Sequence, residues 1–145
     1  MLRAARLVTA ARLVALVALV LPAAACGSLT GTDAPRVPSG TWGGDRIRLD
    51  VTSSGAKIEY DCAHGTIDEA IVVDGTSRFS VAGTYTFERG GSSRSGKAPD
   101  RHPARYDGRV VGDTMEITVT VTDANRRIGR FMLFLNHSAR LVKCR

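Results

Sequence analysis

Apolar side chains alternate with polar ones through most of the chain after residue 45, and this period of two constrains the fold more than any other feature. It is clear in residues 46–52, where Ile47, Leu49 and Val51 alternate with polar residues. Successive side chains of a β-strand point to opposite faces of a sheet, so this spacing predicts strands with one buried face. No stretch of useful length has the apolar spacing of three and four residues that an amphipathic helix needs. The pattern therefore predicts an all-β fold.

The alternating segments are separated by residues that favour tight turns, such as Asp74-Gly75 and Gly112-Asp113. We expect seven or eight short antiparallel strands, which lie near residues 46–52, 56–62, 70–73, 79–87, 105–111, 115–122, 128–135 and 141–144. At this chain length such a set predicts a small barrel or a sandwich. We favour the barrel because Gly83, Gly108 and Gly129 fall at inward-facing positions, where glycine permits sharp curvature. In a sandwich the same glycines would accommodate bulky neighbours.

Residues 1–25 have the composition of a secretory signal peptide. Arg3, Arg6 and Arg12 precede an apolar run at residues 13–25, and the segment contains no acidic residue. A transmembrane anchor would need roughly 20 apolar residues, and this run has only thirteen. Without the signal the formal charge falls from +6 to +3, which is too small to indicate nucleic-acid binding.

The signal ends in Ala23-Ala24-Ala25-Cys26, which resembles a bacterial lipobox. The resemblance implies cleavage before Cys26 and attachment of fatty acyl chains such as palmitate to it. This predicts an exported, lipid-anchored protein of the cell envelope, in the outer membrane if the organism has one. Ordinary cleavage after Ala25 would instead leave Cys26 unmodified. Residues 26–40, rich in Gly, Ser, Thr, Asp and Pro, predict a flexible tether before a barrel domain at residues 41–145.

The chain has three cysteines, and their number favours lipidation of Cys26. In an oxidising compartment three cysteines leave one thiol unpaired, whereas lipidation of Cys26 leaves Cys62 and Cys144 as an even pair. Cys62 continues the inward-facing positions of Ile58 and Tyr60. We therefore predict one disulfide, Cys62–Cys144, that ties the last segment to the second predicted strand.

Motifs for a hydrolase nucleophile, a phosphate-binding loop, a dinucleotide fold and a zinc protease are all missing from the sequence. We therefore expect no enzyme activity and no cofactor. One alternative is a zinc-like site, if the fold brings Asp61, His64, Asp100 and His102 to one rim. Because two histidines without close spacing are weak support, we favour ordinary loop hydrogen bonds and expect no metal.

Four aromatic residues are candidates for a binding pocket inside the barrel: Trp42, Tyr60, Tyr85 and Tyr106. They predict a wall for a small apolar or amphiphilic ligand, and plain core packing explains the same positions. The alternative function is a protein-binding module that acts through the loop at residues 89–103. Its candidate partner-binding residues are Arg89, Arg94, Lys97, Arg101 and His102.

The run at residues 131–135 departs from clean alternation because every residue in it is apolar. Phe131, Leu133 and Leu135 have core parity, which places Met132 and Phe134 on the outside. These two side chains either pack under another part of the chain or form a partner surface.

Several motifs together resemble a family of uncharacterised bacterial secreted lipoproteins. They are Gly40-Thr41-Trp42-Gly43-Gly44, Tyr60-Asp61-Cys62-Ala63-His64-Gly65-Thr66-Ile67, His102-Pro103-Ala104-Arg105-Tyr106 and Lys143-Cys144. The Gly-x-Trp start is similar to that of lipocalins and other calycins, which implies a calycin-like barrel with Trp42 at its closed base. Tyr60-x-Cys62-x-x-Gly65 and Ala104-Arg105-Tyr106 also resemble the membrane-bound inhibitors of chicken-type lysozyme. In those inhibitors Ser-Gly precedes the second motif, whereas here His102-Pro103 does.

Overall fold

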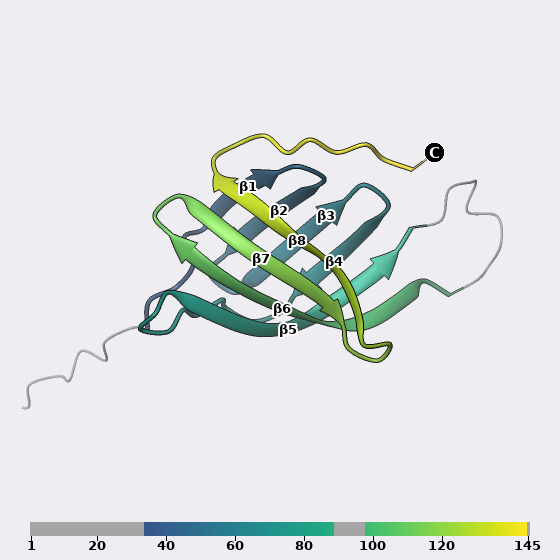
Figure 1. The fold of residues 1–145 in the computed structure, drawn as a ribbon, viewed down its shortest axis with the longest axis horizontal. Coiled ribbons are helices and arrows are strands. Elements are labelled where there is room, and N and C mark those ends of the chain that lie inside the picture. Colours follow the sequence, from purple (N-terminus) through teal and green to yellow (C-terminus); the bar gives the residue numbers. More distant parts are fainter. Residues whose placement is uncertain (1–33, 89–97, 145) are drawn as a thin grey trace, which may run out of the picture. The chain divides into compact units, whose positions relative to one another are not determined.

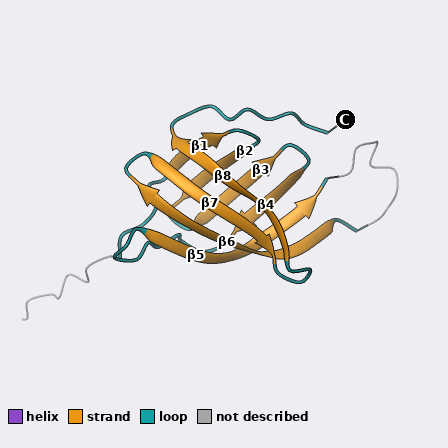
Figure 2. Ribbon diagram, in the orientation of Figure 1, coloured by secondary structure: helices purple, strands orange, loops and turns teal. Residues whose placement is uncertain are grey.

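The computed structural model describes residues 34–88 and 98–144, which contain eight strands and no helix (Figures 1 and 2). Each strand pairs antiparallel with the next, and the first pairs with the last, so the sheet closes into a barrel. The strands are β1 (Gly40–Gly44), β2 (Ile47–Thr52), β3 (Gly55–Tyr60), β4 (Ala63–Ile67), β5 (Arg78–Phe87), β6 (Asp100–Val111), β7 (Thr114–Val121) and β8 (Arg126–Leu135). The predicted all-β antiparallel barrel is confirmed.

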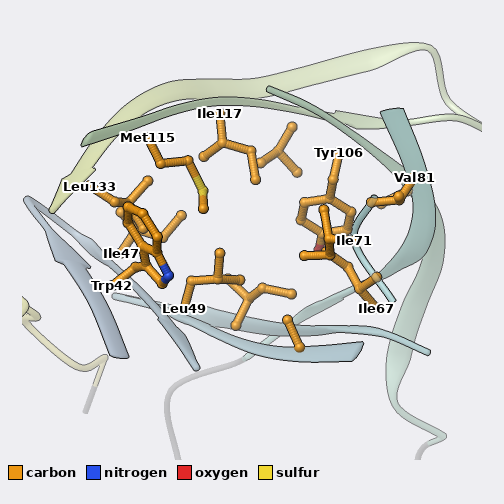
Figure 3. Packing of buried hydrophobic residues seen from close by; sticks show 14 of the residues in the cluster. Trp42, Ile47, Leu49, Ile67, Ile71, Val81, Tyr106, Met115, Ile117 and Leu133 are labelled. Carbon is orange, nitrogen blue, oxygen red and sulfur yellow. The ribbon is translucent and has the colours of Figure 1, made fainter. Parts of the chain in front are cut away.

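The core fills the inside of the barrel with the apolar residues of the alternating pattern. In β7 every second residue from Met115 to Val121 is buried, as the period of two predicts. Figure 3 shows Trp42 beside Leu133 on one side of the core and Tyr106 on the other. Trp42 and Tyr106 are both fully buried, so these two side chains form the core itself.

Two glycines make room for the Tyr106 ring. A Cβ at Gly83 would lie 2.8 Å from a ring carbon of Tyr106, and one at Gly65 would lie 2.4 Å from the Tyr106 hydroxyl oxygen. A Cβ at Gly108 would likewise lie 2.3 Å from the ring of Phe79. The inward-facing glycines of this barrel therefore receive aromatic rings, which fill the space that a missing side chain leaves.

The number of strands is as predicted, but two predicted segments are not strands and two observed strands were not predicted. Residues 63–67, read as a polar loop, form β4, because the inward positions Ala63 and Gly65 are too small to produce a visible apolar alternation. Residues 70–73 and 141–144 are not strands; the first makes only an isolated bridge between Arg36 and Val72. β1 is a separate strand, and the turn that connects it to β2 contains Arg46, whose φ is 65°.

One end of the barrel is closed by two short segments, residues 35–38 and 71–73. The amide of Val37 donates to the carbonyl of Ile71 at 2.9 Å, and both side chains are buried. The indole Nε1 of Trp42 donates to the carbonyl of Pro38 at 3.0 Å. Residues 35–38, which the sequence assigned to the tether, therefore pack against this closed end.

After β8 the chain crosses the outside of β1 toward the opposite, open end of the barrel. A Cβ at Gly43 would lie only 2.1 Å from the carbonyl oxygen of His137, so glycine permits the crossing. Arg140 then bonds through its backbone to Gly44 and Arg46. The segment ends at the predicted disulfide between Cys62 and Cys144, which is confirmed, although Cys62 lies in the turn after β3.

Candidate functional site

A cleft of about 480 Å³ lies at the open end of the barrel, between the β3–β4 turn and the start of β8. Its apolar lining comes mainly from four aromatic side chains, which are Tyr60, Tyr85, Phe87 and Phe131. Three arginines also line it, and these are Arg46, Arg126 and Arg127. We call this feature the mouth cleft.

The aromatic side chains of the mouth cleft form a continuous series. The ring centroids of Tyr60 and Tyr85 are 5.1 Å apart, and those of Tyr85 and Phe87 are 4.8 Å apart with nearly edge-to-face geometry. Phe131 joins the series at 5.7 Å from Tyr60. The guanidinium carbon of Arg126 lies 4.8 Å from the centroid of Phe87, a cation–π contact. The cleft thus combines an apolar floor with a positive edge.

The Tyr60 hydroxyl is the one buried side-chain polar atom without a hydrogen-bond partner in the described residues. The neighbouring Tyr106 hydroxyl donates to the carbonyl of Thr84 at 2.7 Å. Burial, followed by the proximity of Tyr106, raises the pKa of Tyr60. Tyr60 therefore stays protonated near neutral pH, with its hydroxyl buried beside Tyr106.

Asp61 organises the rim of the cleft on the disulfide side. Its carboxylate accepts from Arg46 Nε at 2.6 Å and from the amide of Val142 at 2.8 Å. Its carbonyl accepts from the amide of Cys144 at 3.2 Å. The Val142 amide first, and then Arg46, hold the pKa of Asp61 below its usual value. These bonds hold the last described residues against the β3–β4 turn.

His102 organises the opposite side of the rim. Its ring nitrogens lie 2.8 Å from a carboxylate oxygen of Asp123 and 3.1 Å from one of Asp100, and its ring packs 5.6 Å from that of Phe87. The hydrogen bonds to Asp123 and then to Asp100 raise the pKa of His102 above its ordinary value. The protonated ring thus joins the β7–β8 turn to β6.

This arrangement predicts a pH-dependent stability. Folding raises the pKa of His102, so the protonated ring stabilises the folded state. This stabilisation is complete below the unfolded pKa of about 6.5 and is lost as the pH rises through the folded pKa. We expect the Tm difference between wild type and His102→Gln to be largest near pH 5.5 and to shrink toward about pH 9. Differential scanning fluorimetry across this range measures it. A Tm difference that grows with pH would contradict the assignment, and Asp123→Asn should weaken the same dependence.

The predicted binding residues are divided between the mouth cleft and the core. All four side chains are buried in the core, but Tyr60 and Tyr85 also line the cleft, whereas Trp42 and Tyr106 do not. Of the predicted partner-binding residues, Arg101 is exposed on β6 and His102 lies at the rim. The other predicted positions, Arg89, Arg94, Lys97 and the lipidation site Cys26, lie outside the described residues.

The alternative zinc-like site does not form in the described part of the chain. His64 is exposed and bonds Glu88 at 2.9 Å, while His102 is engaged by Asp100 and Asp123. Across residues 34–88 and 98–144, no group of three His, Cys, Asp or Glu side chains could hold a metal ion.

The lining residues that sequence reasoning missed include Phe87, Phe131 and Arg126. The inward parity of Phe87 with Tyr85, and of Phe131 with Leu133, could have found two of them. A β-bulge shifts the register of β7 and β8 beyond Val119, so that Arg126 pairs with the inward-facing Val121. The alternation alone contains no signal for that shift.

Comparison of the chain with protein-family models, curated proteins and solved structures finds no match. Among the described residues there is no helix with the length and apolar character to cross a membrane.

Proposed function

We propose that this chain is a non-enzymatic, lipid-anchored protein of the bacterial cell envelope that binds a small amphiphile at the open end of its barrel. The mouth cleft is the observation that carries the proposal. Its volume of about 480 Å³ is within the range of small-molecule sites, and its lining combines four aromatic side chains with three arginines and Asp61. A ligand with an apolar body and an anionic group matches this lining.

Two groups in the mouth cleft support a polar contact to such a ligand. Arg126 and Arg127 form no salt bridge with any other described residue, so their charges are free for an anion.

The envelope location rests on the sequence. The signal-like residues 1–25 and the lipobox-like Ala23-Ala24-Ala25-Cys26 support export and acylation. The Cys62–Cys144 disulfide is compatible with an oxidising compartment. Mass spectrometry of the native protein should find acyl chains on an amino-terminal Cys26, and a free, unacylated amino terminus would contradict the anchor.

The ligand proposal is tested with two anionic amphiphiles, 8-anilinonaphthalene-1-sulfonate by fluorescence titration and dodecanoate by its displacement. We expect saturable binding of one equivalent to the folded chain. Phe87→Ala and Arg126→Gln should each raise the Kd about tenfold, which corresponds to about 1.4 kcal/mol for a lost ring face or charge contact.

Lys57→Gln is the matched control for Arg126→Gln, because Lys57 is an exposed cation on β3 outside the mouth cleft. It should leave the Kd unchanged. Absence of saturable binding of both probes would overturn the proposal, and so would a Kd that is insensitive to Phe87→Ala and Arg126→Gln. Circular dichroism of each variant shows whether the barrel remains folded.

A further inference from the structure

A second, smaller hollow of about 330 Å³ adjoins the mouth cleft where the end of β5, the start of β6 and the β7–β8 turn meet. We call it the side pocket, and its lining residues are Phe87, Asp100, His102, Val121, Ala124 and Arg126. Phe87 and Arg126 line the mouth cleft as well. The two hollows therefore share a wall, and a change at this wall affects both of them.

The ring of Phe87 connects His102 to the mouth cleft. Its centroid lies 5.6 Å from that of His102, with the two rings nearly perpendicular. The Arg126 guanidinium carbon lies 4.8 Å from the same centroid. His102 is thus separated by one aromatic ring from an arginine that is free to bind an anionic ligand.

The two hydrogen bonds of His102 require a proton on each ring nitrogen. Nδ1 lies 2.8 Å from a carboxylate oxygen of Asp123, and Nε2 lies 3.1 Å from one of Asp100. Ionised carboxylates only accept hydrogen bonds, and a neutral imidazole has a single N–H to donate. Loss of one proton from His102 therefore breaks one of these bonds and removes a positive charge beside Phe87.

The charge around His102 determines the sign of the effect on an anion. The titratable and charged groups around its ring are Asp100 and Arg101 on β6, Asp123 in the β7–β8 turn, Arg126 on β8, Tyr85 on β5 and Glu88 just after β5. Of these residue types and histidine itself, only histidine ordinarily titrates between about pH 5 and 8. The protonated ring offsets one of its two carboxylate partners, so an anion near Arg126 is repelled less when His102 is protonated.

The β7–β8 turn keeps other bonds to β6 that contain no titratable group. The amide of Thr122 donates to the carbonyl of Pro103 at 3.0 Å, and the Thr122 hydroxyl donates to the same carbonyl at 3.2 Å. The pairing of β6 with β7 therefore does not depend on the proton of His102. Its loss acts locally, on the Asp123 side of the turn and on Arg126, which begins β8 three residues later.

We propose that the mouth cleft binds its anionic ligand in a pH-dependent manner, tightly when His102 is protonated and weakly when it is neutral. His102 is a positioning residue, because it acts through Phe87, Asp123 and Arg126 and does not line the mouth cleft itself. This regulation rests on the proposed function, since it presupposes an anionic ligand in the mouth cleft.

The test measures the Kd of 8-anilinonaphthalene-1-sulfonate between about pH 5.5 and pH 9. The full chain carries Cys26→Ser, so that no acyl group competes for the probe, and a sulfonate stays ionised throughout this range. We expect the Kd to rise about fivefold from the low to the high end. His102→Gln should give a Kd that does not change with pH. Asp123→Asn should move the midpoint of the change to lower pH, because Asp123 is the largest cause of the raised pKa of His102.

His64→Gln is the matched control, because His64 also bonds a carboxylate, that of Glu88 at 2.9 Å, and lines neither hollow. It should keep the pH dependence of the parent chain. A Kd independent of pH in the parent, or a pH dependence that survives His102→Gln, would overturn the regulation and leave ligand binding in place. Absence of saturable binding at every pH would overturn the proposed function and the regulation together. Circular dichroism at each pH shows whether the barrel remains folded.

Discussion

Replacing Cys144 with serine is expected to lower the free energy of unfolding by about 4.5 kcal/mol. The disulfide closes a loop of 82 residues, and a loop of that length removes much of the conformational entropy of the unfolded chain. The native state also loses the anchor that holds Val142 and Cys144 against Asp61. Urea unfolding under oxidising conditions measures the change, and the Tm should fall markedly.

Cys62→Ser should give the same loss, and the double variant should lose no more than either single one, because all three lack the same bond. Cys26→Ser is the matched control, since that cysteine is outside the disulfide. An unchanged Tm in Cys144→Ser would contradict a stabilising role for the bridge.

Truncating Tyr106 to alanine is expected to lower the free energy of unfolding by about 3–5 kcal/mol, and urea denaturation measures it. The ring is fully buried, and it occupies space that Gly65 and Gly83 leave free. Because those two positions have no side chains that could move into the void, the site cannot collapse around the smaller residue.

Two of the inward-facing tyrosines, Tyr60 and Tyr106, allow a controlled comparison of their hydroxyls. Tyr106→Phe removes the hydrogen bond to the carbonyl of Thr84 and should cost about 1 kcal/mol. Tyr60→Phe removes a buried hydroxyl without a partner, so it should be neutral or stabilising. A larger loss in Tyr60→Phe than in Tyr106→Phe would contradict the hydrogen bonding seen in the structure.

The barrel could be predicted because both faces of most strands have the expected polarity. Ile47, Leu49 and Val51 are buried in β2, and Met115 to Val121 follow the same pattern in β7. β4 was missed because its inward residues Ala63 and Gly65 are small. Position 65 needs a glycine because a Cβ there would meet the Tyr106 hydroxyl. Hydrophobic periodicity reports which residues face a core, and it contains little information on where small residues are needed.

Only part of the candidate site could be predicted from the sequence. Tyr60 and Tyr85 were identified as inward-facing aromatics, but their place at the open end was not, and that place distinguishes them from Trp42 and Tyr106. Which end of the barrel is closed depends on the pairing of Val37 with Ile71. That contact joins two loop segments without periodic patterns, so it arises only from the folded arrangement.

The strand topology also determines the order in which the strands can pair during folding. Every pairing joins strands that are neighbours in the chain except that of β1 with β8, which places Trp42 opposite Leu135. Hairpins can therefore form as the chain emerges. Closure of the barrel requires β8, and formation of the disulfide requires Cys144. Until then β1 and the most recently formed strand expose unpaired edges, which are sites for aggregation. During folding the chain is thus most vulnerable to aggregation shortly before its last strand pairs.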